Sequence, residues 1–244
     1  MSVTVKRAVR ADDPRVVRSR AAVVEAARTL FLRKGYASTT MEEIAAAAGL
    51  TKRTLYNNYP DKDALFRQIV TEVMAVAEAF AQGLHGEFAA EVTAKNLRAT
   101  LDDLARRLAL GIMRPEVVAL RRLLIGEARE FPAFGAKYFE RAPGQVLDAL
   151  ASGFERWGRR GLLRVTSAAG ARIAAAQFAY LVVGEPLDRA MLVGSVASRE
   201  HVLECAREGV ETFLARYSAG RSGRSGPAGS TARAGRRTSA GRTP

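Results

Sequence analysis

The stretch that decides the fold is TTMEEIAAAAGLTKRTLYNNYPDKDALF, residues 39–66. It holds two short helical patterns, one on each side of Gly49, and a threonine precedes each pattern. Thr40, followed by Glu43 three residues later, is a capping-box signature that predicts the start of a helix. Gly49 ends this helix, because a chain that reverses within a few residues needs a positive φ. The spacing predicts a helix-turn-helix.

The second short helix of this motif is predicted over residues 52–58, with Thr51 as its N-cap and Pro60 as its end. Leu55 is the apolar side chain that would hold this helix inward, so most of the others point outward. Lys and Arg reach guanine edges or phosphates, Asn pairs with adenine, and Thr methyls or Tyr rings pack on thymine methyls. Hydroxyls and helix N-termini hold phosphates. We therefore predict DNA contacts from Thr40, Thr51, Lys52, Arg53, Thr54, Tyr56, Asn57, Asn58, Tyr59 and Lys62.

The charge of the chain is concentrated at its two ends. The 244 residues carry a net charge of +13, yet residues 61–217 are nearly neutral. Residues 218–244 hold six arginines and no acidic residue, and residues 1–60 are also basic. A basic end on a neutral body suggests a polyanionic partner. A surface whose charge serves only solubility is the alternative, as is an ordinary surface helix at residues 52–58.

Cysteine and histidine are scarce. Cys205 is the single cysteine, which excludes an internal disulfide and a multi-cysteine metal site. His85 and His201 stand isolated, so we predict no metal site and no cofactor. The N-terminus lacks the apolar stretch of a secretory signal, and the longest uncharged helical run, residues 173–184, is too short to cross a membrane. A reducing cytoplasm fits these features.

The apolar pattern between the two ends is helical, and strands are hard to find. The chain is therefore predicted to be all-α, with about nine helices. Residues 1–14 are interpreted as a flexible basic arm and residues 218–244, rich in Gly, Ser and Arg, as a disordered tail. Residues 15–60 would form a three-helix domain and residues 61–217 a C-terminal bundle. Helices are expected up to Gly35, over the two short patterns, from Asp61 onward, and at about 93–112, 115–130, 133–160 with a bend near Pro143-Gly144, 169–184 and 199–217.

The sequence AARTLFLRKGYASTTMEEIAAAAGLTKRTLYNNYPDKDALF, residues 26–66, resembles the N-terminal domain of the TetR family of bacterial transcriptional regulators. The shared skeleton is LF…KGY…TT…IA..AG…TLY..Y..K..LF. The resemblance implies a homodimeric repressor in the cytoplasm, at the nucleoid, whose third helix enters the major groove. Its C-terminal domain would bind a small molecule and dimerise. Arg53, Asn57 and Asn58 depart from the residues frequent in the family, so the operator is not inferred from relatives.

Residues 115–143, PEVVALRRLLIGEAREFPAFGAKYFERAP, resemble the C-terminal domain of the AefR-like branch of that family, which implies a fold and a dimer. Large apolar residues are numerous in this half of the chain. Any one of them could fill a core, but the resemblance implies that some line a ligand pocket. The residues predicted for the pocket are Phe80, Leu104, Leu108, Phe131, Phe134, Tyr138, Trp157 and Phe178.

The helix expected at residues 173–183 is apolar nearly all round, so it must be buried on every side. The last helix repeats apolar residues at spacings of three and four. We predict that both helices bury their outer faces in a second copy, in a symmetric four-helix bundle; a closed monomeric core is the alternative. The predicted interface residues are Ala175, Phe178, Val182, Leu203, Ala206, Val210 and Phe213.

These features predict a ligand-responsive repressor that binds a near-palindromic operator on double-stranded DNA as a homodimer. A small apolar or amphipathic effector would release it, with the long helix from Asp61 as the lever. An enzyme is the second hypothesis, but the sequence holds no phosphate loop, nucleophile elbow or HExxH motif. An architectural DNA binder without ligand control is the third, and the basic tail gives it some weight.

Overall fold

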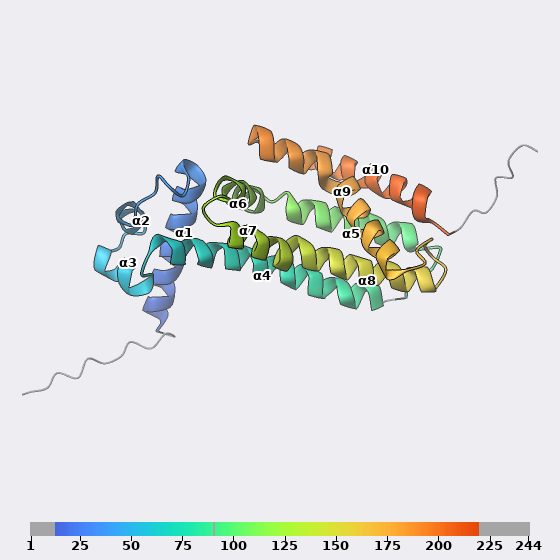
Figure 1. Cartoon of the computed structure of the whole chain (residues 1–244), viewed down its shortest axis with the longest axis horizontal. Coiled ribbons are helices and arrows are strands. Elements are labelled where there is room, and N and C mark those ends of the chain that lie inside the picture. Colours follow the sequence, from blue (N-terminus) through green and yellow to red (C-terminus); the bar gives the residue numbers. More distant parts are fainter. Residues whose placement is uncertain (1–12, 90, 220–244) are drawn as a thin grey trace, which may run out of the picture.

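The computed structural model describes residues 13–89 and 91–219, and it is helical throughout (Figure 1). Most of the predicted arm and tail, at residues 1–12 and 220–244, therefore lies outside the described residues. The predicted all-α class is confirmed, since the described residues contain only an isolated bridge and no strand. The helices are α1 (Pro14–Lys34), α2 (Met41–Ala47), α3 (Lys52–Asn58), α4 (Lys62–Ala89), α5 (Leu97–Ile112), α6 (Pro115–Gly126), α7 (Pro132–Phe139), a π-helical turn η1 (Glu140–Gly144), α8 (Gln145–Arg159), α9 (Ala168–Val193) and α10 (Arg199–Tyr217).

Helices α1 to α3 form a small domain at one end of the molecule, and α4 leads from it into the C-terminal bundle (Figure 1). α1 starts at Pro14, in the first position, where no backbone donor is needed. The carboxylate of Asp13 caps it by accepting a hydrogen bond of 2.8 Å from the Arg15 backbone. α1 ends at Gly35, whose φ of 86° favours glycine. The last residue of the predicted arm is thus the first residue of a helix.

The core of the N-terminal domain continues into the helices that follow it. Phe31, Ile44 and Leu55, from α1, α2 and α3, are buried in one apolar cluster. The same cluster holds Phe66 and four other residues from the first half of α4, and three leucines of α6. The first half of α4 therefore packs with the domain predicted at residues 15–60.

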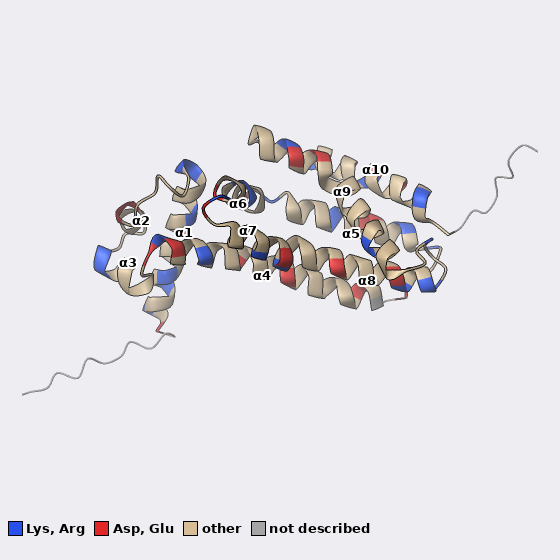
Figure 2. Cartoon of the chain, viewed as in Figure 1, with Lys and Arg blue, Asp and Glu red and all other residues tan. Residues whose placement is uncertain are grey.

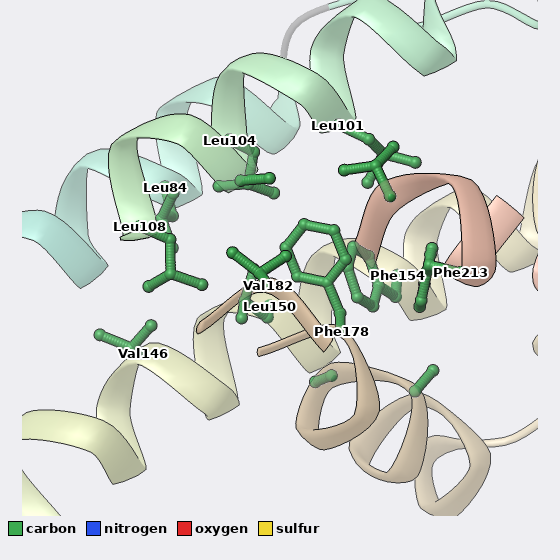
Figure 3. Packing of buried hydrophobic residues seen from close by; sticks show 14 of the residues in the cluster. Leu84, Leu101, Leu104, Leu108, Val146, Leu150, Phe154, Phe178, Val182 and Phe213 are labelled. Carbon is green, nitrogen blue, oxygen red and sulfur yellow. The ribbon is translucent and has the colours of Figure 1, made fainter. Parts of the chain in front are cut away.

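A second apolar cluster forms the core of the C-terminal bundle. It is built from the second half of α4 and from α5, α8, α9 and α10 (Figure 3). Phe154 of α8, Phe178 of α9 and Phe213 of α10 meet at its centre, with ring centroids 5.1 to 5.5 Å apart. All three are fully buried within one chain.

The helix predicted at residues 133–160 is divided by the π-helical turn. Pro143 has no backbone N–H, and its ring opposes the carbonyl of Phe139 four residues earlier, so an ordinary helical turn does not fit there. A Cβ on Gly144 would lie 2.9 Å from the carbonyl oxygen of Phe139, so the turn also needs a glycine. The bend predicted near Pro143-Gly144 has this physical cause.

Helix α9 is longer than its prediction at residues 169–184. It continues through the buried Pro186 to Val193 and ends at Gly194, which is in the left-handed region. α9 crosses α10 at Gly209, where a Cβ would lie 2.6 Å from the carbonyl oxygen of Leu181. Ser218 forms a bridge with Leu163, so the predicted tail begins with ordered residues. Within the described residues, none of the helices is both long and apolar enough to span a bilayer.

Candidate DNA-binding surface and ligand cavity

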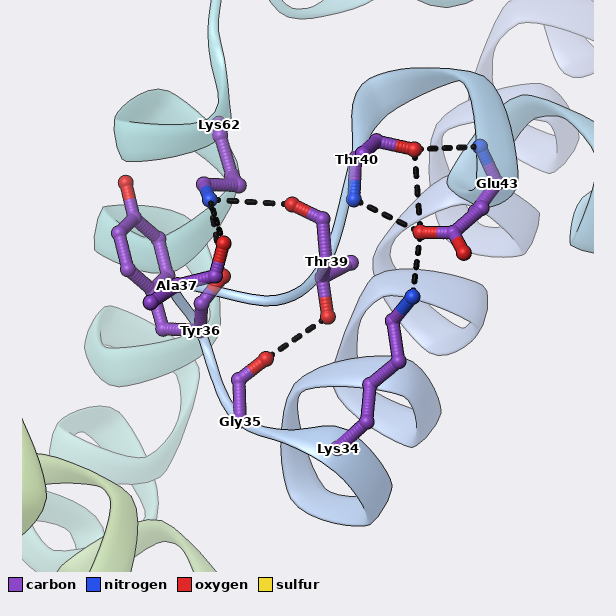
Figure 4. A network of polar contacts seen from close by, with 8 residues as sticks. All are labelled: Lys34, Gly35, Tyr36, Ala37, Thr39, Thr40, Glu43 and Lys62. Atoms are coloured by element: carbon purple, nitrogen blue, oxygen red, sulfur yellow. Dashed lines mark hydrogen bonds and ion pairs between the residues drawn. The ribbon is translucent and has the colours of Figure 1, made fainter.

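Polar caps hold the start of α2. The Thr40 hydroxyl accepts a hydrogen bond from the Glu43 backbone at 3.3 Å, and the Glu43 carboxylate accepts one from the Thr40 backbone at 2.9 Å. The same carboxylate pairs with the Lys34 ammonium of α1 (Figure 4). The ammonium, together with the hydrogen bonds from Thr40, lowers the pKa of Glu43 to about 2. The predicted capping box is thus present, and it also ties α2 to α1.

The turn between α2 and α3 holds both helices at a fixed angle. Gly49 has a φ of 66°, as its place in the turn requires. The Thr51 hydroxyl caps α3 by accepting a hydrogen bond of 3.2 Å from the Thr54 backbone. Leu55 is fully buried beneath α3. The orientation of α3 is therefore set by a cap at its start and an apolar anchor at its middle.

The outer face of α3 presents four side chains to solvent: those of Lys52, Arg53, Tyr56 and Asn57. Figure 2 shows that basic residues mark this end of the molecule, on α1 and α3. Arg53, Tyr56 and Asn57 make no ion pair or side-chain hydrogen bond within the described residues, so their polar groups remain available to a partner. Lys52 pairs with Glu42 at 3.1 Å, and this exposed pair is weak enough for a phosphate to replace the carboxylate.

Three residues predicted to contact DNA have structural roles within the fold. The Lys62 ammonium donates to the carbonyls of Tyr36, Ala37 and Thr39 at 2.8, 3.3 and 3.0 Å, and it lies 4.3 Å from the centre of the Tyr36 ring (Figure 4). It satisfies the carbonyls that follow α1, a role that the sequence did not predict, and its contact with DNA stays a prediction.

Asn58 and Tyr59 are also directed inward. The Asn58 amide donates a hydrogen bond of 3.0 Å to the hydroxyl of Ser19, which ties α3 to α1. Tyr59 is half-buried against the N-terminal core, and this burial raises the pKa of its phenol. The sequence predicts that both face DNA, and a local pattern does not reveal these partners on other helices.

An aromatic joint connects the N-terminal domain to α7. We define this joint as Tyr36, Phe66, Phe131 and Phe134, whose neighbouring ring centroids lie 5.1 to 5.8 Å apart. The Tyr36 hydroxyl donates to Asp63 of α4, and burial, with this carboxylate, raises the pKa of the phenol. Phe131 and Phe134 were predicted to line a ligand pocket. They belong to this joint instead.

A cavity of about 470 Å³ lies in the C-terminal bundle, among α4, α5, α6, α7, η1, α8 and α9. Three of the predicted pocket residues line it, namely Phe80, Leu108 and Tyr138. Leu104, Trp157 and Phe178 are buried in the bundle core and do not reach it, which corrects the prediction for them. Apolar residues that the prediction missed complete the wall, among them Val73, Val76, Ala77, Ile112, Val117, Phe139, Ala142, Val146, Leu147, Val183, Leu187 and Met191.

Few polar groups reach the cavity. Arg107 is already held by Glu87 and Asp103. Arg121, half-buried at the wall, makes no ion pair within the described residues. It lies near Tyr138, whose phenol pKa is raised by burial and lowered in part by the Arg121 charge. Arg114, Tyr180 and Asp188 also line it. The cavity thus has an apolar body with a few polar groups at its wall, the arrangement that fixes the orientation of an amphipathic ligand.

Comparisons with known proteins agree with this architecture. A model of the bacterial regulatory proteins of the tetR family matches residues 23–69, and a model of the C-terminal domain of AefR-like transcriptional repressors matches residues 99–219. A crystal structure from Mesorhizobium loti MAFF303099, described as a TetR-family regulator, is 31% identical, with a TM-score of 0.72 over 84% of this chain and 100% of that one. The chain belongs to the TetR family of transcriptional regulators.

Two further TetR-type structures are similar. One is a regulator from Agrobacterium tumefaciens, at 26% identity and a TM-score of 0.64 over 82% of this chain and 94% of that one. The other is the flavonoid-responsive regulator FrrA, at 28% identity and a TM-score of 0.58 over 83% and 98%. No curated protein matches the sequence significantly. The resemblance to the TetR family and its AefR-like branch is therefore confirmed, and with it a DNA-binding regulator of a family that responds to ligands.

The interface predicted for a TetR-type dimer is wrong in most of its residues. Six of the seven are buried within the single chain, because α9 and α10 pack against each other and against α5 and α8: Ala175, Phe178, Val182, Ala206, Val210 and Phe213. Leu203 is half-buried. The apolar side chains that α9 leaves exposed include Ile173, Tyr180, Leu181 and Leu192.

The histidines and the cysteine differ from one another in their surroundings. His85 makes a hydrogen bond of 2.9 Å to the Ala81 carbonyl within its own helix. His201 and Cys205 face each other and Glu185 of α9, although the sequence predicts no metal site. Their spacing of four residues on one helix was the signal available in the sequence.

Proposed function

We propose that this TetR-family protein is a homodimeric repressor that reads a near-palindromic operator through α3 and is released by an amphipathic effector bound in the cavity. One observation carries the proposal. The helix-turn-helix presents Arg53, Tyr56 and Asn57 without partners among the described residues, and part of the cavity wall, including Tyr138 and Ala142, belongs to the same apolar cluster as that motif.

Each exposed side chain of α3 has a role in this proposal. Asn57 would pair with an adenine, and Tyr56, which is 46% exposed, would pack on a thymine methyl. Arg53 would reach a guanine or a phosphate, and Lys52 would exchange Glu42 for a phosphate. The caps at Thr40 and Thr51 hold the two helix N-termini, so register would come from the backbone as well as from side chains.

A second copy would associate through the exposed face of α9. Ile173, Tyr180 and Leu192 are 56%, 69% and 78% exposed, so this face has apolar surface to bury. A twofold axis there would hold the two α3 helices in a fixed relation, and a separation of roughly 34–36 Å, one turn of DNA, fits two half-sites. A dimer of this kind reads an inverted repeat, and it would act in the cytoplasm, where the nucleoid is.

The effector would place an apolar or aromatic body in the cavity and a polar or anionic group beside Arg121 and the Tyr138 phenol. FrrA, a similar protein, is described as flavonoid-responsive, which supports a ligand of this chemistry. The match to AefR-like repressors supports repression over activation.

The coupling would run through the wall that the cavity shares with the N-terminal core. Tyr138 and Ala142 are members of the N-terminal cluster and also line the cavity. Val73 and Ala77 of α4 line the cavity too, and they are partly buried against the same cluster. An effector that fits the cavity better when this wall has moved would favour a conformation with the wrong spacing of α3 helices. α4, from Lys62 to Ala89, carries the displacement along the molecule.

The deciding experiment is to incubate the purified chain with sheared genomic DNA of its source, at near-physiological salt, and to sequence the retained fragments. We expect a shared inverted repeat, lost in Asn57→Ala and retained in Lys95→Ala, which removes an exposed cation far from α3. Uniform retention that salt abolishes would overturn the proposal and favour an architectural DNA binder.

A further inference from the structure

A cluster of three metal-type ligands lies outside both the DNA-binding face and the cavity. Glu185 projects from α9, and His201 and Cys205 project from α10. The imidazole Nε2 lies 3.0 Å from a Glu185 carboxylate oxygen and 3.6 Å from the Cys205 sulfur. All three ligand atoms lie within 4.8 Å of one another, the one group of this kind that the described residues contain.

We propose that this cluster binds a single Zn²⁺ ion, with water as the fourth ligand. The distances carry the proposal. In a tetrahedral zinc site, the metal–ligand bond lengths place a nitrogen and an oxygen ligand about 3.3 Å apart, and a nitrogen and a sulfur ligand about 3.6 Å apart. The two distances from His201 to Glu185 and Cys205 are close to these values, so the ion fits after small side-chain movements. A thiolate, an imidazole and a carboxylate together suit Zn²⁺ better than Mg²⁺ or Ca²⁺.

The surroundings position the ligands as a metal site requires. A ligating histidine usually directs its other ring nitrogen to a carboxylate; a Glu204 oxygen lies 4.0 Å from the Nδ1 of His201, which is beyond hydrogen-bond range but close enough to reach it by a side-chain movement. The Ser198 hydroxyl caps α10 by accepting a hydrogen bond of 3.2 Å from the His201 backbone, so this first turn is held. The close crossing of α9 and α10 at Gly209 fixes the distance between the helices.

The local charge favours a cation. The carboxylate of Glu185 from α9 lies within 4.8 Å of the Cys205 sulfur, and that of Glu204 from α10 lies 4.0 Å from the His201 ring. A divalent ion bound beside these two carboxylates favours the thiolate, which releases its proton to solvent as the Zn–S bond forms.

The bound ion would join α9 to α10. Glu185 is exposed on α9 and lies one helical turn from the exposed Leu181. Zn²⁺ that binds the folded chain would stabilise this helix pair by mass action. The inference does not depend on the operator or on the effector.

The test is a titration of the untagged, reduced full-length chain with Co²⁺, followed by displacement with Zn²⁺. We expect one Co²⁺ per chain, with a thiolate-to-cobalt charge-transfer band in the near ultraviolet that Zn²⁺ removes. Cys205→Ser and His201→Ala should abolish the band, and Glu204→Gln should weaken binding about 10-fold. His85→Ala, the matched control, should change nothing.

Circular dichroism of each variant separates loss of the site from loss of the fold. The proposal is overturned if the folded wild-type chain takes up no Co²⁺ at concentrations of tens of micromolar. It is equally overturned if uptake persists in folded Cys205→Ser and His201→Ala, because the ion would then sit elsewhere.

Discussion

The N-terminal domain and the C-terminal bundle achieve their order in different ways. The domain uses helices of seven residues, α2 and α3, and holds them by caps and one buried leucine. The bundle uses helices of up to 28 residues and contains a cavity of about 470 Å³. Helices of seven residues are not stable in isolation, so α2 and α3 are helical only while they are packed against the rest of the domain. The proposed DNA contacts thus lie in the tightly packed N-terminal domain, and the proposed effector site lies in the bundle that contains the cavity.

The largest effect should come from breaking the aromatic joint between the two regions. Phe66→Ala removes a fully buried ring that touches Tyr36, Phe131 and Phe134, and should lower the free energy of unfolding by about 3–5 kcal/mol. Chemical denaturation measures this loss. Phe154→Ala, an equal deletion in the bundle core, should spare operator binding at low temperature, whereas Phe66→Ala should not. Equal operator affinity in both variants would contradict the conclusion that the aromatic joint supports the DNA-binding domain.

The contrast between Asn57 and Asn58 sharpens the division within α3. Asn57→Ala should cost about 1–3 kcal/mol in discrimination between operator and mismatched DNA, with an unchanged melting temperature. Asn58→Ala removes the hydrogen bond to Ser19 and should cost about 1 kcal/mol of stability with no loss of discrimination. Competition binding and thermal melting of both variants measure this, and exchanged phenotypes would refute the assignment.

Lys62 tests whether a cation near DNA is structural. Lys62→Met keeps the apolar stem but loses the bonds to three carbonyls, so it should lower stability by about 1–2 kcal/mol. The dependence of DNA affinity on salt should keep its slope, because no phosphate contact is lost. A slope reduced by about one unit would show instead that Lys62 binds phosphate.

Arg121 tests the sensing region alone. Arg121→Gln should weaken binding of an anionic aromatic probe about 10-fold, the scale of one charge-assisted hydrogen bond at a partly open site. Operator affinity without probe should not change, since Arg121 belongs to α6 and lies outside the helix-turn-helix. Fluorescence titration measures the first quantity and gel shift the second; equal probe affinity in both proteins would remove Arg121 from the site.

The smallest effect concerns the cap at α2. The pKa of Glu43 is lowered from 4.5 to about 2 in the folded chain, so the ionised carboxylate stabilises the fold above pH 4.5. This contribution should fade as the pH falls from 4.5 toward 2. NMR titration of the Glu43 carboxyl carbon measures the pKa directly, and Glu43→Gln should be insensitive over that interval. Titration near 4.5 would mean that Lys34 and the capping hydrogen bonds do not hold it.

The N-terminal motif was predictable because its signals are local. Thr40 with Glu43, and Thr51 before Lys52, determine where α2 and α3 begin, and both helices lie where the caps predict. The inward roles of Asn58 and Lys62 were not predictable, because Ser19 and the carbonyls after α1 come close only in the folded chain. The roles of the exposed α3 side chains on DNA stay a prediction.

In the bundle, residue type alone did not distinguish core from cavity. Leu108 lines the cavity and Leu104 does not, although they are one helical turn apart on α5. Which of them faces the empty volume depends on how α5 is rotated against α8 and α9, and a period of 3.6 residues does not give that angle. Most of the apolar residues of α9 are likewise buried against helices of the same chain, whereas Ile173 and Tyr180 are exposed.

Tyr138 and Ala142 form a wall with the cavity on one side and the core of the DNA-binding domain on the other. Because the wall is shared, a change in its position affects the effector site and the DNA-binding domain together. If effector binding lowers the affinity for the operator by a given factor, operator binding lowers the affinity for the effector by the same factor. A molecule seated on its operator would therefore respond only at a higher dose than a free one, and the DNA itself would set the threshold of the sensor.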